Sequence, residues 1–600
     1  MQKNEIDIIF QKLINAYQAK KEKEVEAIAK IILDTSPSHI GANAILGMFY
    51  VEKKEYQNAI GLLNASLAGD AKQFWVHDYL ALSLINTNDV NTAIHHLNIA
   101  TKLNPRYANA YFNLGIAYEK IGLFELAVEN YNQCLKLEKN YTDALIGRGN
   151  VYLYKLSNFQ KAIEDYTLYI EMQPKSFIGY LSLAKAYKIS NRLLEALENF
   201  NIGIKLNDVN EDLYVGRAAV LSELKQYEKS LEDYNKLINL RSDNANFYVS
   251  RGVVLSELKK YTEALKDYEE ALKINPQNDE AILNKGIVLL KFKKFDIGWE
   301  FLPSRLNIEE HKVLPLQFIS KPLFILNKNK DKKTLILGEH GIGDQILYAS
   351  MLKDFKKQCG AISLAVDKRL IDLFERSFPD IRVIDKNNLS DFHDYDQYIL
   401  QLDLGNYCRN TLEKFPLHNP FLLADPNKSL KIKESLIRNS EPKKIICGVS
   451  WKSKNEKFGK SKSIPIEKLL PILKLEHITF VNLQYGDTQH EIDFICKEYG
   501  IKIHNIQEID NTNDIDGLCS IINMCDFVIT SSNVTAHISG GLGKETYILL
   551  PHSNGKIWYW HEDDNRSLWY PSCKLYSQLN HNDWTAPIEK ILEEINNYAK

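Results

Sequence analysis

The chain has 600 residues, 45% of them hydrophobic and 25% charged, which is too long for one compact core and predicts several domains or a repeat array. The formal net charge of -3 excludes a strong global field, so we expect no nucleic-acid partner. Apolar runs of about 18 residues are absent, and the amino-terminal segment has no apolar signal core. These features predict a cytoplasmic protein without a membrane span.

Eight cysteines lie scattered without a Cys-x-x-Cys pair. This pattern favours reduced, mostly buried thiols and argues against a zinc site or a disulfide framework. The sequence Asp394-Tyr-Asp396 is interpreted as surface rather than as a metal-binding pair. We therefore predict no metal and no cofactor.

The first half of the chain repeats itself at a period of 34 residues, with one interval of 35 near Leu156. Equivalent positions are held by Leu46, Leu80, Leu114, Arg148, Leu183, Arg217, Arg251 and Lys285. The second part of each unit has a small residue at a fixed offset, namely Ala59, Ala93, Ala127, Ala162, Ala196, Ser230 and Ala264. Small residues let two helices cross closely, and the pattern resembles the tetratricopeptide repeat.

The repeats are expected to form an α-solenoid over residues 1–306, with a degenerate first unit at 6–39 and a degenerate last one from 279. That length corresponds to about eight helix pairs, which stack into a superhelix with a concave groove for an extended peptide or a partner protein. Five polar residues on the first helices either face this groove or are merely solvated: Asn113, Arg148, Lys185, Arg217 and Arg251.

An irregular junction and linker at 307–333 leads to an α/β region, whose first half we place at 334–440. Strands are predicted at 334–338, 362–366, 381–384 and 397–402, alternating with helices, as in a parallel doubly wound sheet. Gly341 and Gly343 lie in the first strand-to-helix turn, followed by Asp344 and Gln345. A carboxylate there could take a proton from an acceptor hydroxyl or cap the helix, and the residues alone do not decide between these roles.

The second half is placed at 441–600, with strands predicted at 445–450, 478–483 and 527–530. The stretch 526–551 combines a strand, a polar turn, a short helix and a glycine-rich exit. Ser531, Ser532, Asn533 and Thr535 surround the expected helix start. Free N–H groups, the helix dipole and the hydroxyls of Ser531, Ser532 and Thr535 would suit a diphosphate, although an ordinary βαβ turn explains the residues equally well.

Two such halves would face each other across a cleft. The second half would contribute Trp451 with the lysines at 452, 454, 457, 460 and 462, the segment from Gln484 through Tyr485 to Gly486, and residues 531–537. Lysines in a loop are most often solvated, but beside a helix start one or two could neutralise a pyrophosphate.

Several motifs together resemble the heptosyltransferase-like GT-B glycosyltransferases, in the branch with amino-terminal tetratricopeptide repeats. They are Gly341-Ile-Gly-Asp344, Gly448-Val-Ser-Trp451 with Lys462-Ser-Ile-Pro465, Val481-Asn-Leu-Gln484-Tyr-Gly486, Ile529 to His537 with Gly541-Leu-Gly-Lys544, Trp558-Tyr-Trp560 and Trp569-Tyr-Pro-Ser572, and at the junction Gly298-Trp299 and Arg305. The fold class that this implies is a tetratricopeptide solenoid followed by a GT-B unit with two Rossmann-like halves.

The resemblance also implies an inverting, metal-independent transfer from a nucleotide-activated sugar, with Asp344 as general base. Lys462 and the segment ending in Ala536 and His537 would meet the donor phosphate. Gly341, Gly343, Gln345, Trp451, Lys452, Gln484, Tyr485, Ser531, Ser532, Asn533 and Thr535 would complete the substrate site. Many relatives have Asp-Thr where this chain has Ser532-Asn533, which leaves that pair's role less secure.

Three functions are compatible with these features. The first is a protein glycosyltransferase whose repeat groove selects a Ser/Thr acceptor in a polypeptide, for example a flagellin-like one. The second keeps the chemistry but acts on a surface glycan. The third is a repeat scaffold or chaperone with an inactive GT-B unit, which the presence of Asp344 and of the lysine loop disfavours.

Overall fold

The computed structural model describes residues 3–308, 322–324, 331–388, 395–417, 420–439, 445–454, 459–552, 557–561 and 565–598. The chain separates into two compact units, Met1–Ser242 (unit 1) and Asp243–Lys600 (unit 2). The end of the repeats predicted at 306 therefore lies inside unit 2. Most of the predicted junction at 307–333, together with Asp394 and Lys457, lies outside the described residues.

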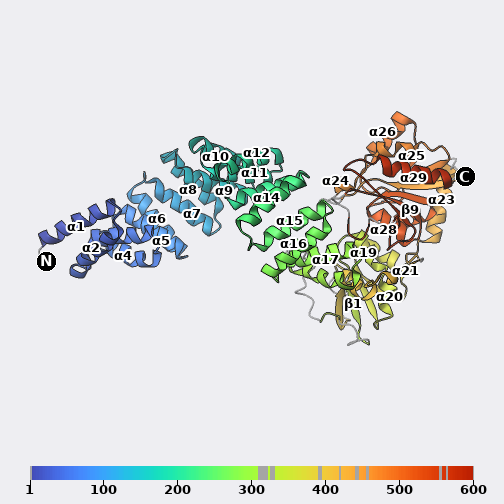
Figure 1. Ribbon diagram of the computed structural model, residues 1–600, viewed down its shortest axis with the longest axis horizontal. Coiled ribbons are helices and arrows are strands. Elements are labelled where there is room, and N and C mark those ends of the chain that lie inside the picture. The colour runs from blue at the N-terminus through green and yellow to red at the C-terminus, as the bar shows by residue number, and fades with distance from the viewer. Residues whose placement is uncertain are drawn as a thin grey trace. The chain divides into compact units, whose positions relative to one another are not determined.

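Unit 1 is built from helices that pair with their neighbours through short turns (Figure 1, blue to green). The helices are α1 (Lys3–Gln18), α2 (Glu22–Thr35), α3 (Ile40–Glu52), α4 (Tyr56–Gly69), α5 (Phe74–Asn86), α6 (Val90–Leu103), α7 (Ala108–Lys120), α8 (Phe124–Leu137), α9 (Thr142–Tyr154), α10 (Phe159–Met172), α11 (Phe177–Ile189), α12 (Leu193–Leu206), α13 (Glu211–Glu223) and α14 (Tyr227–Leu240).

Unit 2 opens with further helices of the same kind. They are α15 (Ala245–Glu257), α16 (Tyr261–Ile274), α17 (Asp279–Lys291), the short α18 (Phe295–Gly298) and the 3₁₀ helix η1 (Trp299–Asn307). The sequence-derived period is confirmed, because α1 to α16 form eight complete pairs in the described chain and α17 begins a ninth. None of the described helices combines the length and the apolarity that crossing a bilayer requires.

The turn inside each pair holds one residue in the left-handed conformation, with φ between 50° and 79°. These residues are Lys20, Lys54, Asn88, Gly122, Ser157, Asn191, Lys225, Lys259 and Lys293. Left-handed residues commonly end helices because they redirect the backbone. The one interval of 35 falls between Gly122 and Ser157, which confirms the extra residue expected near Leu156.

The small residues of the period lie where paired helices cross. All seven predicted positions are fully buried, from Ala59 through Ser230 to Ala264. On the facing helix a side chain at Gly115 would place its Cβ 2.5 Å from the Tyr131 ring. Close crossing therefore depends on the predicted small residues of the second helices and also on the absence of a side chain at glycines such as Gly115 on the first helices.

The arginines at the repeat positions form ion pairs, which neither sequence interpretation anticipated. Arg148, Arg217 and Arg251 each hold an aspartate of the next helix through two hydrogen bonds. Asn113 donates to buried Asp78 at 2.7 Å. These four side chains are therefore bonded within the repeats rather than merely solvated. Lys185 instead pairs with Asp212 at 3.0 Å while both side chains stay largely exposed.

The first sheet contains four parallel strands in the order β3-β2-β1-β4. The strands are β1 (Thr334–Leu337), β2 (Ile362–Val366), β3 (Arg382–Asp385) and β4 (Gln397–Leu400). The helices between and after them are α19 (Ile342–Ala349), α20 (Leu352–Lys356), α21 (Ile371–Ser377) and α22 (Leu404–Cys408), with short 3₁₀ turns at Lys368–Leu370, Gln401–Asp403 and Leu412–Lys414. The helical segment that carries Asp344 is therefore divided near Ser350, where α19 ends and before α20 begins.

The second sheet contains six parallel strands in the order β10-β9-β8-β5-β6-β7. Its strands are β5 (Ile445–Ser450), β6 (Ile478–Asn482), β7 (Ile503–His504), β8 (Phe527–Ser531), β9 (Glu545–Leu550) and β10 (Cys573–Ser577). Its helices are α23 (Pro426–Asn439), α24 (Gly459–Lys462), η8 (Ile466–Leu469), α25 (Leu470–Leu473), α26 (Gln489–Tyr499), α27 (Ile515–Met524), α28 (Val534–Gly541) and α29 (Thr585–Tyr598). Counted from β5, this is the 3-2-1-4-5-6 order of doubly wound dinucleotide-binding folds.

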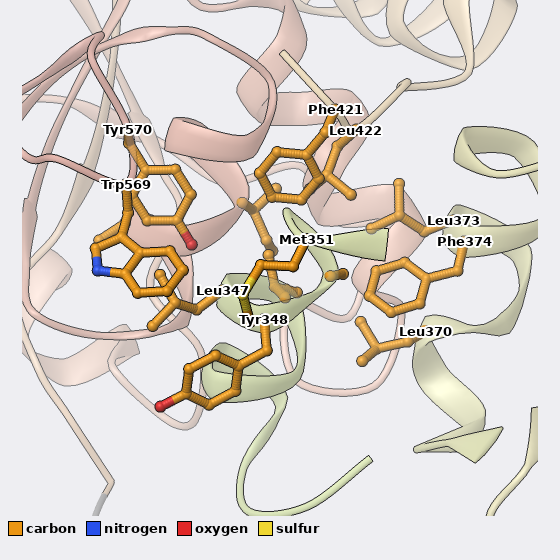
Figure 2. Close-up of a cluster of buried hydrophobic side chains, with 14 of the residues drawn as sticks. Leu347, Tyr348, Met351, Leu370, Leu373, Phe374, Phe421, Leu422, Trp569 and Tyr570 are labelled. Carbon is orange, nitrogen blue, oxygen red and sulfur yellow. The ribbon is translucent and has the colours of Figure 1, made fainter. Parts of the chain in front are cut away.

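One hydrophobic core joins the two sheets within unit 2 (Figure 2). Leu347 and Tyr348 of α19 lie near Trp569 and Tyr570 of the carboxyl-terminal part. In the same core, Phe421 and its neighbour Leu422 donate backbone N–H bonds to the Gly541 carbonyl at the end of α28. The segment between the sheets thus covers α28.

Helix α23 belongs with the second sheet. It packs against α27, and Lys428 forms an ion pair with Asp514 at 3.1 Å. The expected start of the second half at 441 therefore falls after a helix that already packs on that half. The reason is that the polypeptide crosses to the second sheet near Phe421, before the next strand begins.

Trp299 connects the last helices of the repeat pattern to the first sheet. Its indole N–H donates to the Arg409 carbonyl at 2.9 Å, and its ring lies where a side chain at Gly405 would be, 2.4 Å from an ideal Cβ. The ring also meets Trp558 edge to face, with centroids 5.3 Å apart. These helices are consequently fixed to the α/β region by buried aromatic packing.

Candidate functional site

Asp344 is the third residue of α19, at the carboxyl end of β1, and its side chain is only partly exposed. Burial raises the pKa of this carboxyl, while the charges of His340 and Lys462 and the backbone N–H groups of Gly341 and Asp344 oppose the shift. The carboxylate of Asp344 thus interacts with the backbone N–H of Gly341, the residue before α19. In a capping box the third residue of a helix accepts from the same N–H. The two roles left open by the sequence, base and cap, are therefore compatible at this residue.

The turn that carries Asp344 is shaped by two other residues. His340 has φ of 56°, which is unfavourable for a residue with a side chain and recurs at functional turns. Gln345 is fully buried; its amide donates to the His340 carbonyl and accepts from Asp367 N. Gln345, predicted as a substrate contact, thus uses both ends of its amide to hold this turn.

The strand ends of the second sheet are joined by two amide side chains. Gln484 Oε1 accepts hydrogen bonds from Ser450 Oγ, Trp451 N and Lys452 N at 2.7 to 3.0 Å. Asn533 accepts from Thr535 N and so caps α28, and its Nδ2 donates to Ser450 Oγ and the Lys452 carbonyl. Of the polar residues that surround the expected helix start, Asn533 is thus the cap. Both amides are buried and engaged within the protein.

Lys462 is buried, with 5% of its surface exposed, at the end of α24. Burial lowers its pKa, and the charge of Asp344 opposes that shift. Within the described ranges no carboxylate oxygen comes within ion-pair distance of its Nζ. A buried ammonium group without a paired anion is costly, so this position favours an anionic ligand.

Three other residues of the lysine loop, Trp451, Lys452 and Lys454, have partners of their own. Trp451 is fully buried in the core of the second sheet, and its indole donates to Glu491, which also pairs with Lys452 at 2.8 Å. The Tyr485 hydroxyl accepts from Lys454 N at 3.2 Å. These residues therefore position the loop, whereas Lys462 is the lysine electrostatically linked to Asp344.

The hydroxyl groups at the start of α28 differ in whether they have a hydrogen-bond partner. Ser531 Oγ accepts from Asn533, Ser532 Oγ accepts from the Trp560 indole at 2.8 Å, and Ala536 is buried in the core. Thr535 is fully buried, and its Oγ1 has no hydrogen-bond partner among the described residues. Of the hydroxyls predicted to meet a diphosphate, Thr535 is the one that remains unsatisfied.

The two sheets bring α19 and α28 into direct contact. A Cβ on Gly343 would lie 2.8 Å from His537 Cδ2, whereas at Gly341 the nearest atom would be Asp344 Oδ2 at 3.7 Å. Asp344, Lys462 and His537 thus form one cluster at the carboxyl ends of both sheets, where open α/β folds bind ligands.

Two tyrosines of this cluster were not assigned a role from the sequence. The His537 Nδ1 lies 3.0 Å from the Tyr570 hydroxyl, and Nε2 lies 3.3 Å from the Tyr559 hydroxyl. Both tyrosines lie in motifs on which the family resemblance rests, and that was the available signal. His340 was also missed, because a single histidine in a turn carries no pattern. No group of three or more metal-ligating side chains occurs in the described part of the chain.

Comparison with known families confirms the repeats. The model described as "Tetratricopeptide repeat" matches residues 108–141 and 245–278, and that described as "TPR repeat" matches 83–122 and 219–259. The chain thus carries tetratricopeptide repeats, followed by two parallel sheets with helices.

Similar proteins include Protein FlbA of Caulobacter vibrioides, 28% identical over 291 residues, which are 45% of this chain and 47% of that protein. A UDP-N-acetylglucosamine--peptide N-acetylglucosaminyltransferase of Giardia intestinalis is 28% identical over 109 residues, 18% of this chain and 7% of that protein, within the repeats. The chain spans less than half the length of either relative. A tetratricopeptide repeat protein from Parabacteroides merdae aligns with a TM-score of 0.34 at 20% identity, covering 42% of this chain and 98% of that one.

Proposed function

We propose that the protein is a GT-B-type glycosyltransferase that moves a sugar, with inversion, from a nucleotide donor to a Ser or Thr hydroxyl of a protein bound by the repeats. The observation that carries this proposal is the electrostatic interaction of Asp344 with the buried Lys462, which has no carboxylate partner among the described residues, at the carboxyl ends of the two sheets. One supplies a base and the other a cation, which are the two charges that such a transfer needs.

In the proposed reaction the acceptor oxygen attacks the anomeric carbon of the donor sugar. Its O–H proton passes to the Asp344 carboxylate as the new C–O bond forms, and the bond between the anomeric carbon and the diphosphate breaks. A base raised in pKa by burial is closer to the pH of the reaction, which favours proton transfer. General-base catalysis of this kind contributes about 10²- to 10⁴-fold in rate.

The departing diphosphate gains negative charge in the same step. The Lys462 ammonium and the amino-terminal end of α28 would stabilise that charge. The hydroxyl of Thr535, which has no partner among the described residues, would donate to a phosphate oxygen. None of these contributions requires a metal ion.

A protein acceptor is supported by the repeats and by one relative. Tetratricopeptide repeats commonly bind extended peptides. The Giardia intestinalis protein that matches within the repeats is named for transfer of N-acetylglucosamine to peptide. A flagellin-like polypeptide remains one candidate acceptor, and a surface glycan is the alternative substrate.

The test begins with calorimetry of the full chain against UDP-, GDP-, ADP-, dTDP- and CMP-activated sugars. The sugar that binds is then used in transfer assays with Asp344→Asn, for which Asp372→Asn in the first turn of the neighbouring helix α21 is a matched, exposed control. We expect Asp344→Asn to bind donor and to lose nearly all transfer, and Asp372→Asn to retain both.

Mass spectrometry of proteins and surface glycans from cells with and without the gene would identify the acceptor. A glycan rather than a protein that loses sugar in the deletion would favour the alternative substrate. If no nucleotide sugar binds the wild-type chain, the proposed enzyme is wrong and a repeat scaffold is favoured.

A further inference from the structure

His537 is buried within the second half of the α/β region, where aromatic side chains contact its ring. It lies one turn into α28, with 3% of its surface exposed. Its two ring nitrogens face the hydroxyls of Tyr570 and Tyr559 at 3.0 and 3.3 Å, and its ring lies beside Trp560, with centroids 5.4 Å apart. Both nitrogens of this imidazole are therefore already hydrogen-bonded, although the residue was predicted to meet the donor phosphate.

The carbon edge of the same ring is the surface against which α19 rests. A methyl group at Gly343 would come within 2.8 Å of Cδ2, closer than carbon atoms approach without a shift of one of them. The ring cannot move freely, because the two tyrosine hydroxyls fix its orientation. The His537 ring on α28 thus limits how closely α19 can approach. The approach that is observed is possible because residue 343 on α19 has no side chain.

The ring carries no charge at this position. Burial, together with the nearby charge of Lys462, lowers the pKa of His537 to about 3. A neutral ring leaves the electrostatics of the cluster to Asp344 and Lys462, which shift each other's pKa in opposite directions. Their mutual effect depends on separation. Asp344 lies on α19, whereas Lys462 lies on α24 of the second half, in the loop that Asn533 at the start of α28 holds through the Lys452 carbonyl. The approach of α19 to α28 therefore fixes how far Asp344 lies from the half that carries Lys462.

We propose that His537 is a positioning residue, an uncharged spacer between α19 and α28 that sets the separation of Asp344 from Lys462, rather than a ligand of the donor diphosphate. Tyr559 and Tyr570 are the residues that hold the spacer in place. This proposal rests on the proposed function for its catalytic consequence, but its structural core, the contact of His537 with Gly343, does not.

The contact is tested by a thermal double-mutant cycle on the full chain with Gly343→Ala, His537→Ala and the double variant. We expect Gly343→Ala to lower the melting temperature of the wild type. His537→Ala removes the ring atoms that the methyl group at 343 would meet, so in that background Gly343→Ala should cost much less. Gly341→Ala is the matched control, since its methyl group would meet ordinary van der Waals distance only; it should show no coupling to His537→Ala. Equal losses from Gly343→Ala in both backgrounds would overturn the spacer.

A second arm uses Tyr570→Phe and Tyr559→Phe, which each remove one hydroxyl and leave the ring. The spacer predicts unchanged calorimetric affinity for nucleoside diphosphates, lower turnover, and an acidic limb of the pH–rate profile that moves to lower pH. The sign follows from Lys462, which lowers the pKa of Asp344. A ring that is no longer held can give way, so the separation shrinks, the pKa of Asp344 falls further, and the carboxylate becomes a weaker base.

The ligand hypothesis predicts the opposite pattern. Loss of about tenfold or more in nucleoside diphosphate affinity in His537→Ala, with an unmoved acidic limb in both tyrosine variants, would overturn the spacer. A wild-type chain that binds no nucleoside diphosphate would instead contradict the proposed function, and the thermal cycle would still decide whether His537 spaces the two helices.

Discussion

Arg305 of η1 donates three hydrogen bonds to the carboxylate of Glu339, at 2.6, 2.8 and 3.0 Å, although their side chains are only 3% and 2% exposed. Its remaining nitrogen donates to Asp403 at 2.7 Å and to the Leu302 carbonyl at 2.9 Å. Glu339 directly precedes the turn of His340 that leads to Asp344. The end of the repeat pattern is thereby hydrogen-bonded to the turn that carries the candidate base.

Arg305→Met should destabilise unit 2, because it leaves Glu339 and Asp403 buried without a cation, at a cost of about 3 to 5 kcal/mol. Guanidinium unfolding followed by tryptophan fluorescence is suitable, since all seven tryptophans except Trp75 lie in unit 2. Arg438→Met removes an exposed ion pair of α23 and serves as the control with little change. Equal midpoints for the two variants would contradict a stabilising role for Arg305.

Arg217 and Asp233 provide a test inside unit 1. Arg217→Leu copies the residue that four other repeats have at this position, but it leaves Asp233, which is 2% exposed, without its partner. We expect a loss of about 1 to 3 kcal/mol. The double variant Arg217→Leu/Asp233→Leu should recover most of that loss, because replacing both members of a buried pair by apolar groups is often neutral.

This difference is measured by unfolding followed through helical ellipticity at 222 nm. A double variant as unstable as Arg217→Leu would show that the cost comes from the lost packing of the arginine rather than from an unpaired carboxylate.

Asp344→Asn should change the pH dependence of stability as well as the rate. The pKa of Asp344 is raised in the folded protein, so the folded state binds this proton more tightly than the unfolded state does. Its contribution to stability is complete below its unfolded pKa of about 3.9 and is lost as pH rises through the higher folded value. At neutral pH the Asn variant should therefore be at least as stable as the wild type.

Melting curves of both proteins between about pH 4 and pH 7 check this expectation, with Asp372→Asn as the control. A melting temperature of Asp344→Asn that falls clearly below that of the wild type at neutral pH would indicate that the ionised carboxylate mainly caps α19.

Lys462→Ala should weaken donor binding by about 1 to 3 kcal/mol, the scale of one charge-assisted hydrogen bond. The ligand-free protein should not lose stability, because the substitution removes a buried charge that has no carboxylate partner among the described residues. Lys460→Ala, two residues earlier in α24 and exposed, is the matched control. If calorimetry showed weaker donor binding in Lys460→Ala and unchanged binding in Lys462→Ala, Lys460 would be the lysine that contacts the phosphate.

The sequence by itself determined the parts of this protein that depend on local pattern. The 34-residue period located the helix pairs and the buried small residues at their crossings. Apolar runs located β2 and β5 to the residue, and a run of polar residues that includes Asn533 located the start of α28. Short parallel strands such as β7, with two residues, carry too little pattern to be predicted. The motifs also singled out Asp344 and Lys462, whose roles in transfer stay a proposal.

Only the tertiary structure decided which polar side chains form hydrogen bonds or ion pairs within the protein. Arg217 could be a groove residue or a solvated one by its sequence, and it is paired with an aspartate on the next helix. His537 matches a phosphate-binding motif, yet tyrosines 22 and 33 residues away hold both its nitrogens. The physical reason is that these partnerships join residues distant along the chain. They depend on the angle and spacing at which helices and sheets pack, and no local pattern encodes that geometry.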